Sequence, residues 1–331
     1  MKKRLSIGTA SAEPGAKGSG LLEVVKRPDG SPINLPVLIV NGAEEGPTFV
    51  VNAALHGSEI PSIYSIIKLY HEMDPKKLKG TFIGVPILNY PAFEGRRRTV
   101  ELTLSDPGLA STDLRYPGNP KGWIQQRIAY TFFNEIAIKA DYYIDHHGGS
   151  RDYEQVRRVL PNTDPGSMEM AKATGFQFLL KPTPPQGIIV LLKEKGKLKT
   201  SIGMEAGGGT WHVKAFLEAV NGVFEGDMNV MKYLGMLEGK QTLLSGSQMI
   251  VDRLSIGCNN GGLLIPEPAW EMRKEVQEGT CIAKILNIVG DEIERLIAPC
   301  DGIIMGGKRT LCVQPGESIL RFGKIIEVVK P

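Results

Sequence analysis

Short apolar runs alternate with amphipathic stretches along the first two thirds of the chain, and this alternation limits the fold more than any other feature. The apolar runs have the length and the β-branched or aromatic content of buried strands. They cover residues 35–40, 47–55, 80–88 and 140–145. The amphipathic stretches 59–74, 121–140 and 166–174 indicate helices. Strands alternating with helices predict an α/β fold, with a mixed and largely central sheet flanked by helices.

The pattern changes near residue 240. Before that point, 176–180 and 187–194 indicate two more strands, and 213–236 indicates the last long helix. After it, short apolar runs are broken by Gly, Pro and Asp, with almost no helical periodicity. We therefore expect a large α/β domain over 1–238, the candidate catalytic domain, followed by a small all-β domain, a barrel or a sandwich, over 239–331.

Composition narrows the class of protein. The chain has 331 residues, is 42% hydrophobic and carries a net charge of +3, so it has ample material for a core and no cationic run that indicates nucleic acid or an acidic membrane. Four cysteines without C-x-x-C spacing indicate reduced thiols rather than a zinc site. The absence of a signal peptide pattern and of an apolar run of about 18 residues predicts a cytoplasmic protein.

A histidine and a carboxylate stand three residues apart where an apolar run ends. His56 and Glu59 follow the predicted strand 47–55, and residues at i and i+3 lie on the same side of a helical turn. Zinc favours imidazole and carboxylate ligands, and catalytic zinc usually has three protein ligands. The pair therefore predicts two ligands of a zinc site that needs a third.

The third ligand is predicted at the end of another strand. Asp145, His146 and His147 follow an apolar run, and alternate residues of an extended chain face the same way. His147 can therefore share a side with Asp145 while His146 faces the opposite side. Asp145 either orients a metal-bound imidazole from behind or only caps the turn.

These motifs resemble the zinc site of the succinylglutamate desuccinylase/aspartoacylase family, which belongs with the zinc carboxypeptidases. The resemblance rests on H-G-S-E at 56–59 and on D-x-H-x-G at 145–149. It extends to SIGMEAGGG at 201–209, where it implies that Glu205 is the general base; the alternative is a carboxylate that is hydrogen-bonded to the glycine-rich turn. It also extends to the tail, where GGLLIP, V-x-x-G-T and APCDGII resemble the β domain of family members.

The resemblance also implies groups that bind the substrate. The stretch PILNYPAFEGRRRT is similar to the family's N-x-x-A-F segment with a following arginine, which matches Asn89 as a substrate-binding residue and Arg98 as the cation that stabilises the oxyanion. A solvated loop is the other interpretation of the arginine triplet. The chain reads STDLRYPGNP where the family usually has D-L-N-R and then F-P-G. Either Arg115 binds the substrate carboxylate in a shifted register, or the substrate lacks an α-carboxylate there.

The resemblance thus predicts a zinc-dependent hydrolase with one Zn²⁺ per chain that cleaves the amide of an N-acyl amino acid or related N-acyl amine. One alternative is a metallocarboxypeptidase or amidase that acts on a short peptide or cell-wall fragment. Another is an inactive homologue that binds a metal or ligand, which the altered D-L-N-R stretch leaves open. We expect a small-molecule partner, neither nucleic acid nor a membrane, and exposed strand edges would permit a homo-oligomer.

Overall fold

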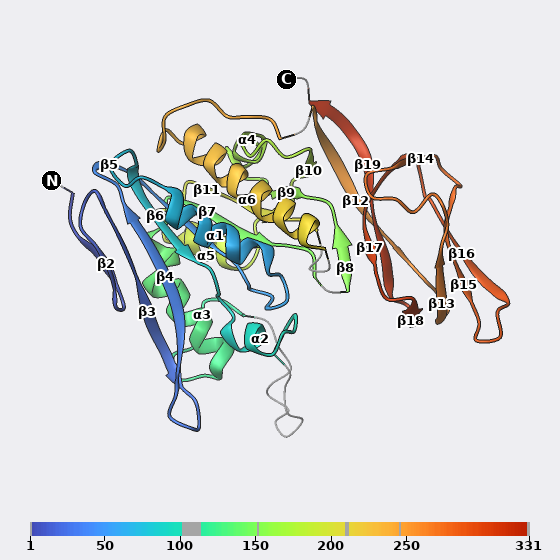
Figure 1. Cartoon of the computed structure of the whole chain (residues 1–331), viewed down its shortest axis with the longest axis horizontal. Helices are drawn as coiled ribbons and strands as arrows, with labels where there is room; N and C mark the ends of the chain where they lie inside the picture. The colour runs from blue at the N-terminus through green and yellow to red at the C-terminus, as the bar shows by residue number, and fades with distance from the viewer. Residues whose placement is uncertain (1, 101–113, 151, 209–211, 245, 330–331) are drawn as a thin grey trace.

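The computed structural model describes residues 2–100, 114–150, 152–208, 212–244 and 246–329. In these ranges one 13-stranded mixed sheet runs through the molecule, with helices on both faces of its N-terminal part (Figure 1). Its strands are β3 (Ala16–Lys26), β4 (Pro32–Asn41), β5 (Glu44–Asn52), β6 (Lys79–Val85), β7 (Tyr142–His147), β8 (Tyr153–Gln155), β9 (Arg158–Pro161), β10 (Phe178–Leu180), β11 (Thr200–Glu205), β12 (Gln248–Gly257), β14 (Glu275–Val276), β17 (Gly302–Lys308) and β19 (Ser318–Val329). Their order is β14-β17-β19-β12-β10-β9-β11-β7-β5-β6-β4-β3, with β8 paired to β17. The predicted α/β fold with a mixed central sheet is confirmed.

The centre of the sheet is parallel. β5 pairs in parallel with β6 and with β7, and β11 pairs in parallel with β7. The carboxyl ends of β5, β7 and β11 therefore meet at one edge of the sheet, which is where α/β proteins bind their ligands. His56 follows the first of these strands, and His147 and Glu205 are the last residues of the other two.

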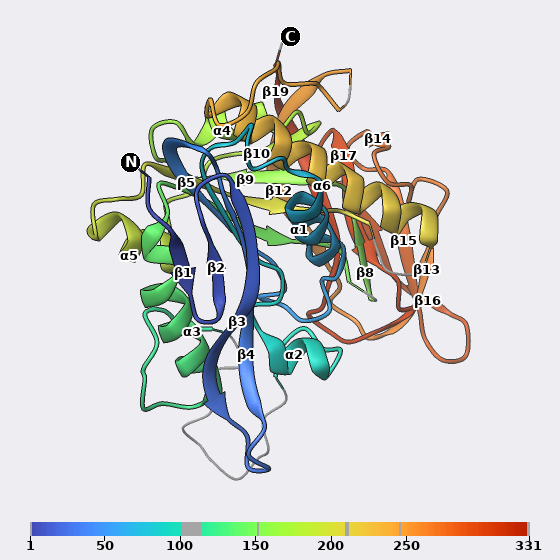
Figure 2. The same ribbon diagram turned by 60° about the vertical axis from the view of Figure 1, so that its left-hand side comes forward.

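Helices cover the two faces of the sheet in two groups. One face packs against α1 (Pro61–Glu72), α4 (Ser167–Ala173) and α6 (Val213–Tyr233), which share a buried core. The other packs against α3 (Ile124–Glu135), the 3-10 turn Ala137–Lys139 and α5 (Ile188–Glu194). Figure 2 brings forward the long hairpin of β3 and β4 at the edge of the sheet, beside the two-stranded sheet of β1 (Leu5–Ile7) and β2 (Ala10–Ala12). None of the helices in the described ranges has the length and apolar content needed to cross a membrane.

The alternation of β7 separates its two neighbouring histidines, as predicted. His146 points to the α6 face, where its Nε2 lies 3.2 Å from Oδ1 of Asp227 and both side chains are fully buried. Burial raises the pKa of Asp227, although the nearby His146 opposes this. Tyr143 packs in the core on the opposite face of the sheet. His147 is four residues further along the strand, so its side chain lies on the same face as Tyr143.

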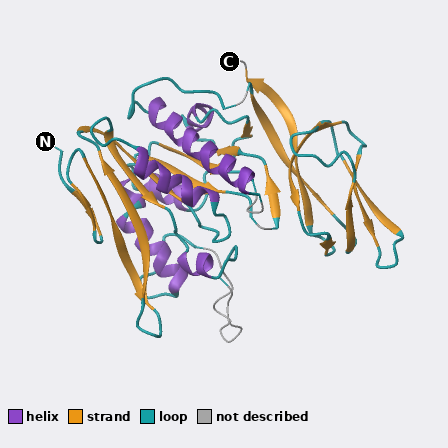
Figure 3. Cartoon of the chain, in the orientation of Figure 1, coloured by secondary structure: helices purple, strands orange, loops and turns teal. Residues whose placement is uncertain are grey.

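The C-terminal part consists of strands and loops only in the described residues (Figure 3). Four of its strands, β13 (Gly262–Pro266), β15 (Cys281–Leu286), β16 (Glu292–Ile297) and β18 (Cys312–Val313), form a separate antiparallel sheet in the order β16-β15-β13-β18. The all-β character predicted after residue 239 is confirmed. However, β12 pairs in parallel with β10, so the main sheet continues across the predicted boundary at residue 238. The division of the chain into two domains at that residue therefore stays a prediction. The four cysteines, all in described residues, are free.

Three details of the sequence-based assignment are wrong. The segment 187–194, predicted as a strand, contains the helix α5 from Ile188 to Glu194; its buried residues Ile188 and Leu192 are four apart, which is helical spacing. The α1 helix begins at Pro61 rather than at residue 59, because proline is favoured at the first helical position. The strands β1 to β3 were not anticipated, since β3 is an edge strand that is only partly buried.

Candidate metal centre and active site

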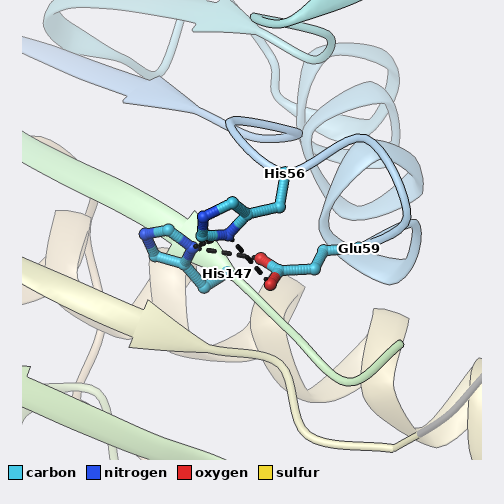
Figure 4. A group of neighbouring side chains, drawn as sticks. All are labelled: His56, Glu59 and His147. Atoms are coloured by element: carbon cyan, nitrogen blue, oxygen red, sulfur yellow. Dashed lines mark hydrogen bonds and ion pairs between the residues drawn. The ribbon is translucent and has the colours of Figure 1, made fainter. Parts of the chain in front are cut away.

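Three side chains from two distant parts of the chain converge at the carboxyl edge of the parallel strands (Figure 4). Nδ1 of His56 lies 3.0 Å from Oε1 of Glu59, and Nδ1 of His147 lies 3.0 Å from Oε2 of the same carboxylate. The two Nδ1 atoms are 3.2 Å apart. The ligand atoms of the three residues all lie within 4.8 Å of one another, so the structure brings together the three predicted ligands.

The first two residues are carried by a tight turn, not by a helix. The backbone N–H of Glu59 donates to the carbonyl of His56 at 3.1 Å, which closes a turn that brings the two side chains to the same side. Glu59 lies two residues before α1 begins. Ala54 enters this turn with φ of 54°, a conformation that non-glycine residues rarely adopt and that is found preferentially at functional sites. A Cβ on Gly57 would lie 2.1 Å from the backbone of Ala92, so only glycine fits against α2 (Tyr90–Glu94).

The third residue is oriented by a chain of hydrogen bonds from behind. Nε2 of His147, the nitrogen that faces away from Glu59, lies 3.3 Å from Oδ2 of Asp145. The other oxygen of Asp145 accepts from Nδ2 of Asn52 at 2.8 Å, and Oδ1 of Asn52 accepts from the hydroxyl of Tyr143 at 2.5 Å. Because every member is fixed by the next, the His147 ring is held with Nδ1 directed at Glu59.

The electrostatics of the cluster favour a cation at its centre. Burial would raise the pKa of Glu59, but hydrogen bonds and charge from His147 and His56 outweigh it and hold this pKa far below its usual range. Burial would lower the pKa of His147, yet Asp145 and Glu59 hold it well above its usual value. Two imidazole nitrogens and a carboxylate that meet at about 3 Å are a donor set that suits Zn²⁺.

Arg98 lies beside the cluster. Its Nη1 donates to Oε1 of Glu59 at 2.7 Å, and its side chain is 59% exposed. The backbone carbonyl of Arg98 accepts from the N–H of Gly57 at 3.2 Å, which attaches this segment to the turn of the first two ligands. The Arg98 guanidinium is therefore held by Glu59 through Nη1, while the rest of the group is exposed and can donate to a ligand.

The two predicted substrate-binding residues differ in their placement. Asn89 is 1% exposed and its Nδ2 donates to the carbonyl of Leu55 at 3.2 Å, so it stabilises the turn that carries His56 and Glu59. This burial gives no support to direct substrate contact by Asn89. Arg115 is exposed between Leu114 and Tyr116, which line a cavity beside His147, so it lies at the border of that cavity.

Glu205 lies one strand away from the cluster. It is the register partner of His147 on β7 and of Arg158 on β9, so the three side chains share one face of the sheet. Oε1 of Glu205 accepts from Nη2 of Arg158 at 2.9 Å, and Oε2 accepts from Nε2 of Gln155. Nη1 of Arg321 on β19 lies 3.9 Å from Oε1. These donors, not the glycine-rich turn, hold the carboxylate.

The sequence alone does not single out the residues that support these groups. Asn52 interrupts the apolar run 47–55 and is the last residue of β5, and this polar position within the run was the available signal for it. Arg158 is fully buried in β9, where a charge is unusual, but the sequence does not distinguish it from the neighbouring Arg157. Arg321 and Gln155, joined by a 2.8 Å hydrogen bond, gave no comparable signal.

Comparison with known proteins decides the family. Residues 45–215, more than half of the chain, match the model of the succinylglutamate desuccinylase/aspartoacylase catalytic domain. The chain belongs to the succinylglutamate desuccinylase/aspartoacylase family. The matched segment contains all three residues of the cluster and Glu205, and the family identified from the sequence motifs is confirmed.

Individual relatives and solved structures cover nearly the whole chain. The N-alpha-acetyl-L-2,4-diaminobutyric acid deacetylase of Halomonas elongata is 25% identical over an alignment 320 positions long, and the alignment covers 89% of this chain and 87% of that protein. A succinylglutamate desuccinylase/aspartoacylase from Rhodobacter sphaeroides has a similar structure, with a TM-score of 0.79, 21% identity, and coverage of 94% and 96% of the two chains. The product-bound ectoine utilization protein EutE (DoeB) of Ruegeria pomeroyi also gives a TM-score of 0.79, with 20% identity and coverage of 98% and 99%. These structural similarities show that the fold is shared along the full length.

Proposed function

We propose that this protein is a zinc-dependent hydrolase that removes the acyl group from an N-acyl amino acid or a related N-acyl amine. The observation that carries the proposal is the convergence of His56, Glu59 and His147 within 4.8 Å at the carboxyl ends of parallel strands. Family membership and the deacetylase named in Halomonas elongata support the same reaction class. The substrate is a small molecule, and a cytoplasmic location remains a prediction from the sequence.

The three ligands suit a catalytic rather than a closed structural site. His56 and His147 each offer Nδ1 and Glu59 offers a carboxylate, and three protein ligands are typical of catalytic zinc, whereas structural zinc usually has four. A divalent ion bound there supplies Lewis-acid chemistry, since it polarises an amide carbonyl and lowers the pKa of a water molecule to roughly 7.

The residues of the chain then have separate roles. Glu205 takes the proton of the attacking water and passes it to the leaving amine, as a general base and then a general acid. Arg98 donates to the oxyanion that develops on the amide carbonyl. Arg115, at the border of the cavity, binds the carboxylate of the amino acid. Asp145 keeps the His147 ring in its orientation.

Replacing Arg98 with alanine is expected to lower kcat/KM by about 10²–10³, the usual loss for one oxyanion donor. The fold and the metal content should not change, because the guanidinium is 59% exposed. Steady-state kinetics and metal analysis measure both. Arg96→Ala, at an exposed position two residues away, is the control and should keep full activity. An unchanged rate for Arg98→Ala would remove Arg98 from the mechanism.

Replacing Asp145 with asparagine is expected to weaken metal affinity by about 10–100-fold, the usual effect of losing the partner of a metal-bound imidazole. The amide keeps the shape of the side chain but not the charge that faces Nε2 of His147 at 3.3 Å. Competition with a chromogenic chelator measures the affinity. Asp74→Asn, at an exposed position, is the control. Equal affinities in the two variants would leave Asp145 as a turn cap only.

One activity screen tests the proposed function. Zinc-loaded protein is assayed against acetyl, succinyl and formyl derivatives of amino acids and diamines, with short peptides alongside. We expect hydrolysis of an N-acyl amino acid or amine, and we expect chelation to abolish it and added zinc to restore it. Preference for the peptides would instead identify a metallocarboxypeptidase or amidase. A metal-loaded protein without hydrolysis of any compound would indicate an inactive homologue.

A further inference from the structure

A cavity of about 440 Å³ opens directly beside the metal cluster. It begins at Leu55, which precedes His56, and at His147 and Asp145 on β7. Its floor continues along the same face of the sheet to Gly203 on β11, and the segment 183–189 that leads into α5 lies across it. This volume is within the range of about 300–1,000 Å³ that small-molecule sites occupy.

The lining of this cavity is mostly apolar. Leucine, isoleucine and proline residues are frequent in the lining; they include Leu55, Leu114, Leu160, Ile188 and Ile189. Of the polar lining residues, Asn162 already donates to Ser201 and accepts from the N–H of Asp164. Asn162 therefore offers a ligand little free hydrogen-bonding capacity.

The charged groups of the lining are already paired. Asp145 and His147 contact each other at 3.3 Å, and His147 also contacts Glu59. Among the described residues that line the cavity there is no lysine or arginine. A second carboxylate or an ammonium group moved into this space, away from Arg115 at the border, would lose its hydration without gaining a free counter-ion from the lining, which disfavours its binding.

We propose that the substrate has a large, uncharged apolar group next to the scissile amide, and that this group fills the cavity. The inference rests on the proposed function and adds the substrate class. The apolar group is either an aliphatic acyl chain or the side chain of a hydrophobic amino acid. Such a substrate differs from a succinyl derivative, which has a second carboxylate, and from diaminobutyrate, which has a second amine.

Two substrate series distinguish the acyl chain from the amino-acid side chain. The first varies the amino acid, with the N-acetyl derivatives of leucine, phenylalanine, alanine and glutamate. The second varies the acyl group, with the acetyl, butanoyl, hexanoyl and succinyl derivatives of alanine. In one series kcat/KM should rise by roughly fourfold for each buried methylene, and the acidic member should be the poorest substrate. Highest kcat/KM for the acidic or the smallest member of both series would overturn the inference.

A binding measurement separates this inference from the proposed function. Calorimetric titration of the zinc-loaded protein uses hexanoate and leucine as apolar probes and succinate and glutamate as acidic ones. We expect at least one apolar probe to bind 10-fold or more tightly than its acidic counterpart, whether or not any amide is hydrolysed. Tighter binding of both acidic probes overturns the apolar assignment even if the protein is an active deacylase.

A pair of variants on α5 provides a matched test. Ile189 lines the cavity and is partly exposed, so Ile189→Lys places a cation at its wall without burying it in the core. We expect this variant to bind the apolar probe at least 10-fold more weakly and to gain affinity for succinate or glutamate. Val190→Lys, at the neighbouring position that is 39% exposed and does not line the cavity, should bind as the unmodified protein does. Identical binding profiles in the two variants would place the apolar probe elsewhere.

Discussion

Replacing His147 with alanine is expected to remove the bound metal and to lower kcat/KM by roughly 10³–10⁴, since the metal is expected to supply several kcal/mol of transition-state stabilisation. His147 contributes the Nδ1 atom that lies 3.0 Å from Glu59 and 3.2 Å from the His56 nitrogen. Without it only two ligands remain, which is fewer than catalytic zinc sites use. Metal analysis after dialysis and steady-state kinetics measure the two effects.

His71→Ala is the matched control for this variant. His71 is an exposed histidine in the last turn of α1, and the hydrogen bond that it receives, from Lys17, goes to its backbone carbonyl and survives the substitution. The control should keep one metal ion per chain and full activity. A His147→Ala protein that also kept both would show that the cluster is not the metal site, and the proposed reaction would then need another centre.

The strands that carry the site could be predicted because central strands are covered on both faces. Such strands appear as nearly continuous apolar runs, and β5 and β7 lie where the runs 47–55 and 140–145 predicted them. The edge strand β3 was missed for the opposite reason. Its residues are only half-buried, so its sequence has no continuous apolar run to reveal it.

The misassigned segment 187–194 illustrates the limit of periodicity in short runs. Eight mostly apolar residues fit a buried strand as well as two turns of helix, and only contacts with the rest of the protein decide between them. The helix places Ile188 and Leu192 against the core and leaves Val190 exposed. This outcome matters for function, because the same segment lies across the cavity beside the metal cluster.

The ligands of the cluster were predictable for a local reason, whereas their partners were not. The two histidines follow apolar runs, Glu59 stands three residues after the first of them, and the ends of parallel strands meet at one edge. The contacts behind them join distant positions: Asn52 and Asp145 are 93 residues apart, and Gln155 and Arg321 are 166 apart. A single sequence does not reveal which distant side chains meet, so the residues that hold Glu205 emerged only from the fold.

Replacing Glu205 with glutamine is expected to leave the metal in place and to lower kcat by about 10²–10⁴, the usual contribution of a general acid–base group. The amide cannot take a proton from water, while the three residues of the metal cluster are untouched. KM should change little, because the loss falls on proton transfer rather than on binding. Metal analysis, steady-state kinetics and thermal unfolding of the variant measure these effects.

The surroundings of Glu205 supply the control that separates proton transfer from a structural role. Gln155 accepts hydrogen bonds from Arg158 and Arg321 and donates to Glu205, so its own orientation is fixed and a glutamine at 205 would turn its NH₂ group toward one of these donors. An NH₂ group that faces another donor leaves a hydrogen bond unmade, which lowers the free energy of unfolding by about 1–3 kcal/mol. Gln155→Ala disturbs the same network but keeps the carboxylate. If Glu205 is the base, Gln155→Ala should retain most of kcat while Glu205→Gln loses it; equal losses in the two variants would mean that Glu205 serves to hold Arg158 and that another group transfers the proton.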